Sequence, residues 1–313
     1  TTHANAVTAG NELKPDSHFG YSNAKVPGTE TVTFNGKQLL VPKVDFSRGN
    51  QFLNAVLKYN EEHPDTPIRM RGHVLVWHSQ TPEWFFHVDY DSSKDYVTKD
   101  VMNQRLEWYI KTILEHYVGE DSKYKDVFYG WDVVNEAVSD GGAAFYRDES
   151  GNSNWWRVYQ SNEFVINAFK FANKYAPASV ELYYNDYGDA SPGKAPKICQ
   201  LLRDVKEQEG APGVGTRIDA FGMPAHYGLD DFDIDNFEAA ARSYLDILGK
   251  VQLTELDMAA SSRYDGTLAT QDQEYLDQAI CYMQIFETLK KLEQIEGYDI
   301  SGITFWGVTD PTS

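Results

Sequence analysis

The chain has 313 residues, enough for one large domain or two ordinary ones, and its 42% hydrophobic content allows a sizeable buried core. Its 47 acidic and 28 basic residues give a net charge of −19, which excludes the basic surface of a nucleic-acid binder and repels anionic membranes. No apolar run approaches the roughly 20 residues that span a bilayer. We therefore expect a soluble enzyme or binding protein for a neutral or cationic ligand, without nucleic-acid or membrane partners.

Short apolar runs that read as strands recur along the chain, and helix-like amphipathic patterns lie between most of them. The expected helices cover residues 96–118, residues 237–248 after an Asp235–Glu238 capping box, and a segment that follows a Thr270–Gln273 capping box. Asn35-Gly36 marks a hairpin turn after the first strand. The seven expected strands are residues 5–8, 69–77, 128–134, 181–186, 219–223, 251–256 and 302–306.

Strands that alternate with helices predict a parallel sheet. Polar residues gather where these strands end, which favours a (β/α)8 barrel with its site at that face over an open sheet with one or two switch points. The residues concerned are Asn11, His78, Asn135, Glu136, Asn185, Asp186, His226, Glu255 and Asp257.

No linker or short repeat interrupts the sequence, so we expect one domain over residues 1–313. Seven strands are one short of a closed barrel. We therefore expect a further strand and helix before Thr1 and a helix after Ser313, or another segment that fills the gap.

Two segments imitate ligand-binding loops. Residues 188–195 resemble a phosphate loop, but Ala195 replaces the metal-binding hydroxyl and Asp189 would repel phosphate. Residues 231–242 resemble a calcium loop, but the sixth position is Asn236 and the twelfth is Arg242, so helix capping is the better interpretation. Serine-nucleophile, zinc and dinucleotide motifs are absent from the sequence, so we expect no metal and no cofactor.

Aromatic residues make up 14% of the chain, which suits both sugar-stacking platforms and core packing. Trp84, Trp131, Trp155 and Trp156 fit either role. Cys199 and Cys281 lie in helix-like patterns and are expected to be buried free thiols rather than a disulfide.

Glu136 and Glu255 each follow a mostly apolar run, where a glutamate kept for solubility is unusual. Two carboxyl groups facing one cleft are the minimal apparatus of glycoside hydrolysis. Salt-bridged structural glutamates would fit the same pattern. Asn135, directly before Glu136, favours sugar chemistry because its amide can bond a hydroxyl group.

Seven distinctive stretches stand in order along the chain: TAGNELKP (8–15), RGHVLVWHSQTPEWF (71–85), WDVVNEAV (131–138), YNDY (184–187), GMPAHY (222–227), LTELDM (253–258) and FWGVTD (305–310). In these stretches, over essentially its whole length, the sequence resembles the glycoside hydrolase family 10 endo-β-1,4-xylanases. The resemblance implies an α/β fold, a (β/α)8 TIM barrel whose first strand and last helix are missing from this chain.

The same resemblance implies a secreted retaining enzyme that cuts internal bonds of xylan without a cofactor. It assigns Glu136 as acid/base and Glu255 as nucleophile. Asn135 would hold a 2-hydroxyl, and His226 and Asp257 would orient and charge-balance Glu255. Sugar contacts would come from Asn11, Lys14, His73, Trp77 and Gln80 on the glycone side, Trp306 at the floor, and Asn185 and Tyr187 towards the aglycone.

Physical chemistry agrees with these roles. Glu255 must stay ionised, which a neighbouring imidazolium favours, whereas Glu136 must stay protonated, which burial and a nearby carboxylate favour. A retaining mechanism requires their carboxyl groups to lie about 5–5.5 Å apart. Without Glu255 beside it, His226 would read as a core histidine, and His78 is interpreted as structural.

The chain departs from the family pattern at Gly10, where a glutamate that binds the −2 xylose is usual, and at Pro224, where glutamine is usual. The given sequence ends just short of the tryptophan that normally follows the last motif. The alternatives are a non-hydrolysing xylan-binding barrel and a retaining glycosidase for another β-1,4-glycan. Additional carbohydrate-binding modules outside this chain are compatible with the xylanase and with both alternatives.

Overall fold

The computed structural model describes residues 4–21, 25–142, 144–211 and 213–307. The end of the FWGVTD stretch, residues 308–310, lies outside them. The chain forms two compact units that interleave along the sequence. Unit 1 comprises Thr1–Ser139, Ala144–Tyr183 and Asp204–Ile218, and unit 2 comprises Asp140–Ala143, Tyr184–Arg203 and Asp219–Ser313. One domain over residues 1–313 stays a prediction.

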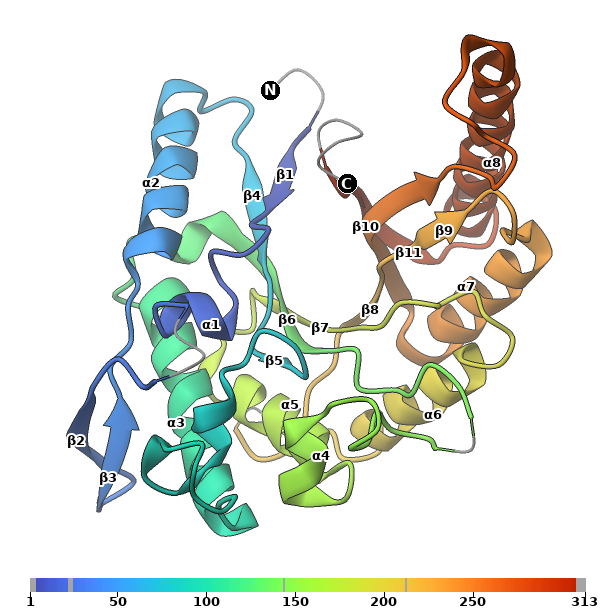
Figure 1. Cartoon of the computed structure of the whole chain (residues 1–313). Coiled ribbons are helices and arrows are strands. Elements are labelled where there is room, and N and C mark those ends of the chain that lie inside the picture. Colours follow the sequence, from blue (N-terminus) through green and yellow to red (C-terminus); the bar gives the residue numbers. More distant parts are fainter. Residues whose placement is uncertain (1–3, 22–24, 143, 212, 308–313) are drawn as a thin grey trace. The chain divides into compact units, whose positions relative to one another are not determined.

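Unit 1 alternates strands with helices (Figure 1). Its elements are β1 (Ala6–Thr8), α1 (Pro15–His18), β2 (Thr29–Phe34), β3 (Lys37–Pro42), α2 (Ser47–Glu62), β4 (Arg69–Gly72), β5 (Val76–Trp77), the 3-10 turns Glu83–Phe86 and Val88–Tyr90, α3 (Lys99–Val118), the 3-10 turn Lys125–Val127, β6 (Phe128–Asn135), α4 (Asn154–Tyr159) and α5 (Glu163–Tyr175). The expected hairpin is confirmed: β2 and β3 pair antiparallel, and Asn35 and Gly36 both have positive φ, as a tight two-residue turn requires.

The sheet of unit 1 is parallel, in the order β1-β4-β6-β7, where β7 (Glu181–Asn185) crosses from unit 1 into unit 2 after Tyr183. Ala6 pairs with Arg69 and Met70 pairs with Phe128. The single strand expected over residues 69–77 is wrong: the run divides into β4 and β5, and β5 pairs with the end of β6. This division sets Trp77 next to Asn135, directly before Glu136.

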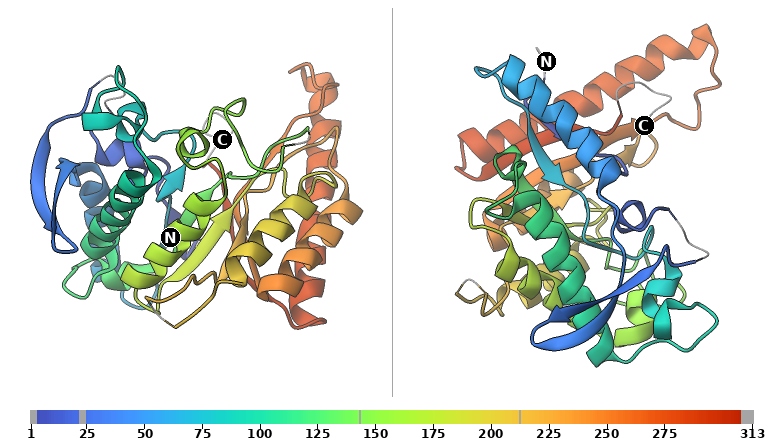
Figure 2. Two further views of the ribbon diagram at one scale, coloured as in Figure 1. Left: turned by 90° about the horizontal axis from the view of Figure 1, so that it is seen from below. Right: turned by 90° about the vertical axis from the view of Figure 1, so that its left-hand side faces the viewer.

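The core of unit 1 is rich in aromatic side chains. Trp84, Trp131 and Trp155 are buried, and Trp156 is half-buried and stacked near Tyr146. Trp84, Trp131 and Trp155 therefore serve packing. A Cβ on Gly72 would lie 2.3 Å from the ring of Trp131, so only glycine fits there. Figure 2 shows the helices in two further views; α3 packs against α5, and α5 packs against β6.

Unit 2 continues the alternation with α6 (Ala195–Lys206), whose last turn falls in unit 1, then β8 (Ala220–Met223), β9 (His226–Gly228), α7 (Ile234–Leu248), β10 (Lys250–Ala259), α8 (Leu268–Gln294) and β11 (Asp299–Phe305). Its strands run parallel in the order β7-β8-β10-β11, and the short β9 pairs with the end of β10. Strand β9 could not be predicted as a strand of its own, because three residues are too few for a periodic pattern.

Both expected capping boxes are wrong. Helix α7 begins at Ile234, capped by the Asp233 carboxylate, which accepts the Asn236 N–H at 2.8 Å. Glu238 instead accepts hydrogen bonds from Arg242 and Lys291. Helix α8 begins at Leu268. The expected helix 96–118 also starts later, at Lys99, after the N-cap Thr98.

Helix α8 packs against α7 and β11, yet it leaves a row of large apolar side chains exposed. This row comprises Tyr275, Leu276, Ile280, Met283 and Phe286. Both cysteines are free thiols; Cys199 is buried as expected, and Cys281 is only half-buried. Among the described residues, every helix is too short or too polar to cross a bilayer.

Candidate active site

The candidate acid, Glu136, directly follows β6 and has φ of 56°, a backbone conformation rare for residues other than glycine. Arg147 Nε donates to its carbonyl oxygen at 3.1 Å and so fixes this turn. Its carboxyl Oε2 accepts the indole N–H of Trp77 at 2.7 Å. His78 Nδ1 lies 3.7 Å from the same oxygen, so His78, expected to be structural, contacts the candidate acid. Backbone strain of this kind commonly marks a functional residue held in place by its neighbours.

Trp77 is held on both sides. Its carbonyl oxygen accepts the indole N–H of Trp155 at 3.0 Å and the hydroxyl of Thr81 at 2.8 Å. The Lys14 ammonium lies 4.9 Å from its ring centroid. The indole that contacts Glu136 therefore has a fixed position.

Three of the expected glycone-side residues form one polar cluster in unit 1. Lys14 Nζ donates to Asn11 Oδ1 at 3.1 Å and to Gln80 Oε1 at 2.9 Å, and Gln80 Nε2 lies 3.2 Å from Asn11 Oδ1. Gln80 also donates to Asp16, whose pKa is raised because burial outweighs these hydrogen bonds and the Lys14 charge. The structure thus joins residues 66 positions apart into a set of donors and acceptors suited to sugar hydroxyls.

His73, the last of the five glycone-side candidates, is buried against Asp132. Its Nδ1 lies 2.7 Å from Asp132 Oδ2, and Arg71 contacts the same carboxylate oxygen. Burial raises the pKa of Asp132, but the Arg71 charge and the bond to His73 outweigh burial, so the net shift is downward. An ionised Asp132 therefore holds the His73 ring in a fixed orientation through Nδ1.

Two candidate amides are buried at the ends of strands. Oδ1 of Asn135 in unit 1 has no hydrogen-bond partner among the described residues. In unit 2, the side-chain nitrogen and oxygen of Asn185 likewise have no hydrogen-bond partner in the part of the chain that the structure describes. A Cβ on Gly222 would lie 1.5 Å from Asn185 Oδ1, so this glycine makes the room that Asn185 occupies. Buried amides of this kind call for a partner, and a substrate hydroxyl is suitable.

The candidate nucleophile, Glu255, lies on β10 in unit 2 and is buried. His226 begins β9 and pairs with Asp257 across the strands. Its Nε2 lies 3.2 Å from Glu255 Oε2, and its Nδ1 lies 2.9 Å from Asp257 Oδ1. Burial lowers the pKa of His226, but the two carboxylates outweigh burial and raise it to about 10. The expected grouping of these three residues is confirmed, and the imidazolium stabilises the negative charge of Glu255.

This shift makes protein stability depend on pH. The pKa of His226 is about 10 in the folded protein and near 6.5 in the unfolded chain. The contribution of His226 to the free energy of unfolding is therefore fully present below pH 6.5 and is lost as pH rises through 10. We expect the free energy of unfolding to fall over this range more steeply in the native protein than in His226→Gln. Denaturant unfolding from pH 6 to 10 measures both slopes; equal slopes would contradict the raised pKa.

The remaining candidates also lie in unit 2. The ring of Tyr187 is covered by the Lys194 ammonium at 3.9 Å, and Lys194 forms ion pairs with Asp186 at 2.7 Å and Asp140 at 2.8 Å. Trp306 is half-buried beyond β11, and its backbone N–H donates to the Leu256 carbonyl at 3.0 Å.

Glu136 belongs to unit 1 and Glu255 to unit 2. A carboxyl separation of about 5–5.5 Å therefore stays a prediction.

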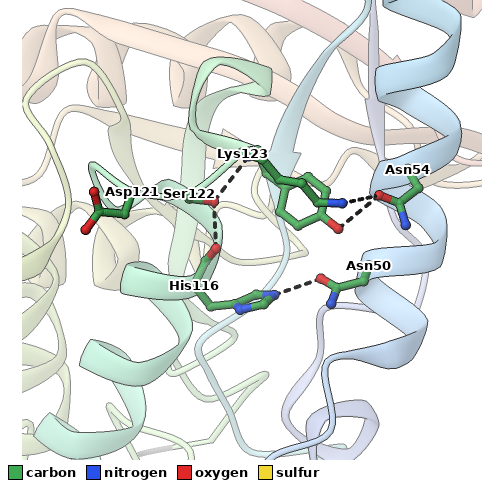
Figure 3. Close-up of a pocket in the computed structure, with 7 residues that line it drawn as sticks. Asn50, Asn54, His116, Asp121, Ser122 and Lys123 are labelled. Atoms are coloured by element: carbon green, nitrogen blue, oxygen red, sulfur yellow. Dashed lines mark hydrogen bonds between the residues drawn. The ribbon is translucent and has the colours of Figure 1, made fainter.

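A pocket of about 330 Å³ in unit 1 includes none of these candidates (Figure 3). Its polar groups bind one another: His116 Nε2 lies 2.7 Å from Asn50 Oδ1, and Lys123 and Tyr124 both donate to Asn54. These hydrogen bonds therefore join α2 to α3 and to the segment that follows α3.

Several residues that support these candidates were not anticipated from the sequence. Asp132 and Arg71 lie inside matched stretches, and their buried charges in apolar strands were a usable signal. Arg147 had no such signal, because it lies outside the matched stretches and contacts Glu136 through a backbone carbonyl.

The chain is similar to known proteins over nearly its whole length. The model of the family described as glycosyl hydrolase family 10 matches residues 1–313. A bifunctional endo-1,4-beta-xylanase of Ruminococcus flavefaciens is 34% identical over 312 residues, which cover 99% of this chain and 28% of that protein. An endo-1,4-beta-xylanase of Geobacillus stearothermophilus is 34% identical over 244 residues, 77% of this chain and 66% of that protein. The chain thus spans only about a quarter of some relatives, such as 25% of a Thermotoga maritima endo-1,4-beta-xylanase.

Solved structures give the same result. The CBM22-1–GH10 modules of Clostridium thermocellum xylanase 10B, complexed with xylohexaose, superpose with a TM-score of 0.77 at 30% identity, covering 99% of this chain and 56% of that chain. A psychrophilic family 10 endo-beta-1,4-xylanase gives a TM-score of 0.74 at 29% identity, covering 99% and 80%. The expected (β/α)8 barrel class is confirmed by these matches.

Proposed function

The chain belongs to glycosyl hydrolase family 10, and from this premise we propose that it is a retaining endo-β-1,4-xylanase. The observation that carries the proposal is the contact of His226 with both Glu255 and Asp257 at the end of β10, within the LTELDM stretch. A binding protein needs no ionised carboxylate kept charged by an imidazolium, whereas a nucleophile does.

In the proposed reaction, Glu136 protonates the glycosidic oxygen of the leaving chain while Glu255 attacks the anomeric carbon, so the C–O bond breaks as a glycosyl ester forms. Glu136, now a carboxylate, removes a proton from water, which attacks the same carbon and releases Glu255. Two inversions retain the configuration. No metal or cofactor takes part.

The polar groups of unit 1 support a neutral sugar chain as substrate. Asn11, Lys14 and Gln80 offer donors and acceptors, and Asp132 holds the His73 ring in place. We place the glycone of xylan or a xylo-oligosaccharide on these groups, with Asn135 on its 2-hydroxyl and Trp306 at its floor. Asn185 and Tyr187 take the aglycone.

The function is tested by reducing-sugar release from xylan and, in parallel, from carboxymethylcellulose. We expect rapid release from xylan, with the β-anomer as the first product in proton NMR spectra. Binding of xylan without release would favour the non-hydrolysing barrel, and faster release from carboxymethylcellulose would favour another β-1,4-glycan.

Gly10 predicts weak binding at the −2 subsite. A Cβ there meets no atom within 4 Å, so a longer side chain fits. We expect Gly10→Glu to raise kcat/KM on xylotriose roughly tenfold, since a charged hydrogen bond contributes about 1.5 kcal/mol or more. An aryl monoxyloside, which has no −2 sugar, serves as the control substrate and should show no gain. An unchanged kcat/KM on xylotriose would refute the subsite gap.

An extracellular location belongs to the same proposal, because a polysaccharide is too large to enter a cell. One matched structure is titled an intracellular xylanase, so the location needs its own test. Fractionation of the native host should place the protein in the culture medium; recovery from the cytoplasm would overturn this part of the proposal.

A further inference from the structure

The segment that imitates a phosphate loop, residues 188–195, places a buried carboxylate beside His226. Oδ2 of Asp189 accepts the Ala225 N–H at 2.8 Å, and Oδ1 accepts the Tyr227 hydroxyl at 2.7 Å. Ala225 and Tyr227 are the residues directly before and after His226. One carboxylate thus holds both chain neighbours of the histidine that contacts Glu255.

The backbone at this point needs such support. Ala225 has φ of 59°, in the left-handed region that residues with a Cβ seldom adopt. The bond from its N–H to Asp189 fixes the conformation in which the chain enters β9. This backbone conformation sets the direction of the His226 ring. The ring direction in turn sets the two contacts of His226, at 3.2 Å to Glu255 and at 2.9 Å to Asp257.

The charge of Asp189 is consistent with this task. Burial raises the pKa of Asp189 to about 6, although the bonds from Tyr227 and Ala225 and the charge of His226 oppose the rise. The Asp186 charge adds to it, and Tyr244 donates to the Asp189 carbonyl oxygen rather than to its carboxylate. At neutral pH the side chain is therefore an ionised acceptor for both donors.

We propose that Asp189 is a positioning residue for catalysis: by holding Ala225 and Tyr227 it sets His226, and through His226 the attacking carboxylate of Glu255. Asp189 is fully buried, so it acts through these neighbours rather than on the substrate. The inference rests on the proposed function, in which Glu255 is the nucleophile.

The test compares three variants that change few atoms. Asp189→Asn keeps the volume but leaves one of the two donors without an acceptor, and Tyr227→Phe removes one donor. Tyr244→Phe is the matched control, because it removes a buried hydrogen bond of 2.6 Å to the same residue's carbonyl but leaves the carboxylate contacts intact. All three are expected to lower the melting temperature, which is measured for each.

We expect Asp189→Asn to lower kcat on xylohexaose about 10- to 100-fold with KM nearly unchanged, because small misplacements of reacting groups have effects of this size. Tyr227→Phe should lower kcat about threefold or more, and Tyr244→Phe less than about twofold. If Asp189→Asn fails to fold, Tyr227→Phe decides. Equal losses of kcat in all variants, following the melting temperature, would show a merely structural role and overturn the proposal.

A readout without substrate separates this inference from the proposed function. The imidazole 15N signals of His226 should shift in Asp189→Asn and Tyr227→Phe but not in Tyr244→Phe. A native protein inactive on xylan would refute the function, and the signals would still test the positioning. Unchanged signals in Asp189→Asn would overturn the positioning whatever the native activity.

Discussion

Replacing Glu255 with alanine is expected to lower kcat about 10⁴-fold or more on every substrate, because no covalent glycosyl intermediate can form. The leaving group does not matter for this loss, since both steps pass through the bond to Glu255. Initial rates on xylan and on aryl xylobiosides with good leaving groups measure it. In the variant, His226 loses one of the two carboxylates that raise its pKa and keeps Asp257, so this pKa should also fall below the native value of about 10.

Glu274 offers a matched control. It is another buried glutamate of unit 2, and its carboxylate accepts hydrogen bonds from the backbone N–H and hydroxyl of Ser261. Glu274→Ala should reduce stability and leave kcat within about threefold, since a lost hydrogen bond acts on folding rather than on the reacting atoms. Substantial turnover by Glu255→Ala, or an equal loss in Glu274→Ala, would contradict the assignment of Glu255.

Replacing Glu136 with alanine should separate substrates by their leaving groups. General acid catalysis contributes about 10²- to 10⁴-fold where the leaving oxygen must be protonated, so release from xylan should fall by this range. Aryl xylobiosides with acidic phenols need little protonation and should still form the glycosyl-enzyme. Their slow step becomes attack by water without a base, so a burst of phenol is expected before slow turnover.

Added azide provides the control for this prediction. Azide is a nucleophile that needs no base, so it should restore fast turnover of the aryl substrate and give a β-xylosyl azide product. Glu136→Gln keeps an acceptor for the Trp77 indole and should show the same pattern. Equal losses on all substrates, with no effect of azide, would argue against Glu136 as the acid/base.

The alternation of strands and helices could be predicted from sequence because hydrophobic runs of four or more residues leave a periodic signal. The short strand β9 and the division of the first long run into β4 and β5 could not, since they depend on pairing with distant strands. The starts of α7 and α8 were misplaced for a related reason. Several residues near each start could act as a cap, and only packing selects among them.

The candidate site divides in the same way. Glu136, Glu255 and His226 could be found because they stand in distinctive local stretches. Asp189 was set aside as part of a failed phosphate loop, because its partners lie 36 and 38 positions away. Its role depends on tertiary contacts that no local pattern records.

Gly222 shows how one position can restrict another during sequence divergence. Its lack of a side chain provides the space in which the Asn185 amide lies, so any larger residue at 222 displaces that amide. A mutational library that varies the two positions separately will score both as intolerant for one shared reason. When both positions are varied together, a larger residue at 222 should be tolerated only in variants that also lack the Asn185 amide. The pair therefore indicates whether selection still maintains this part of the site.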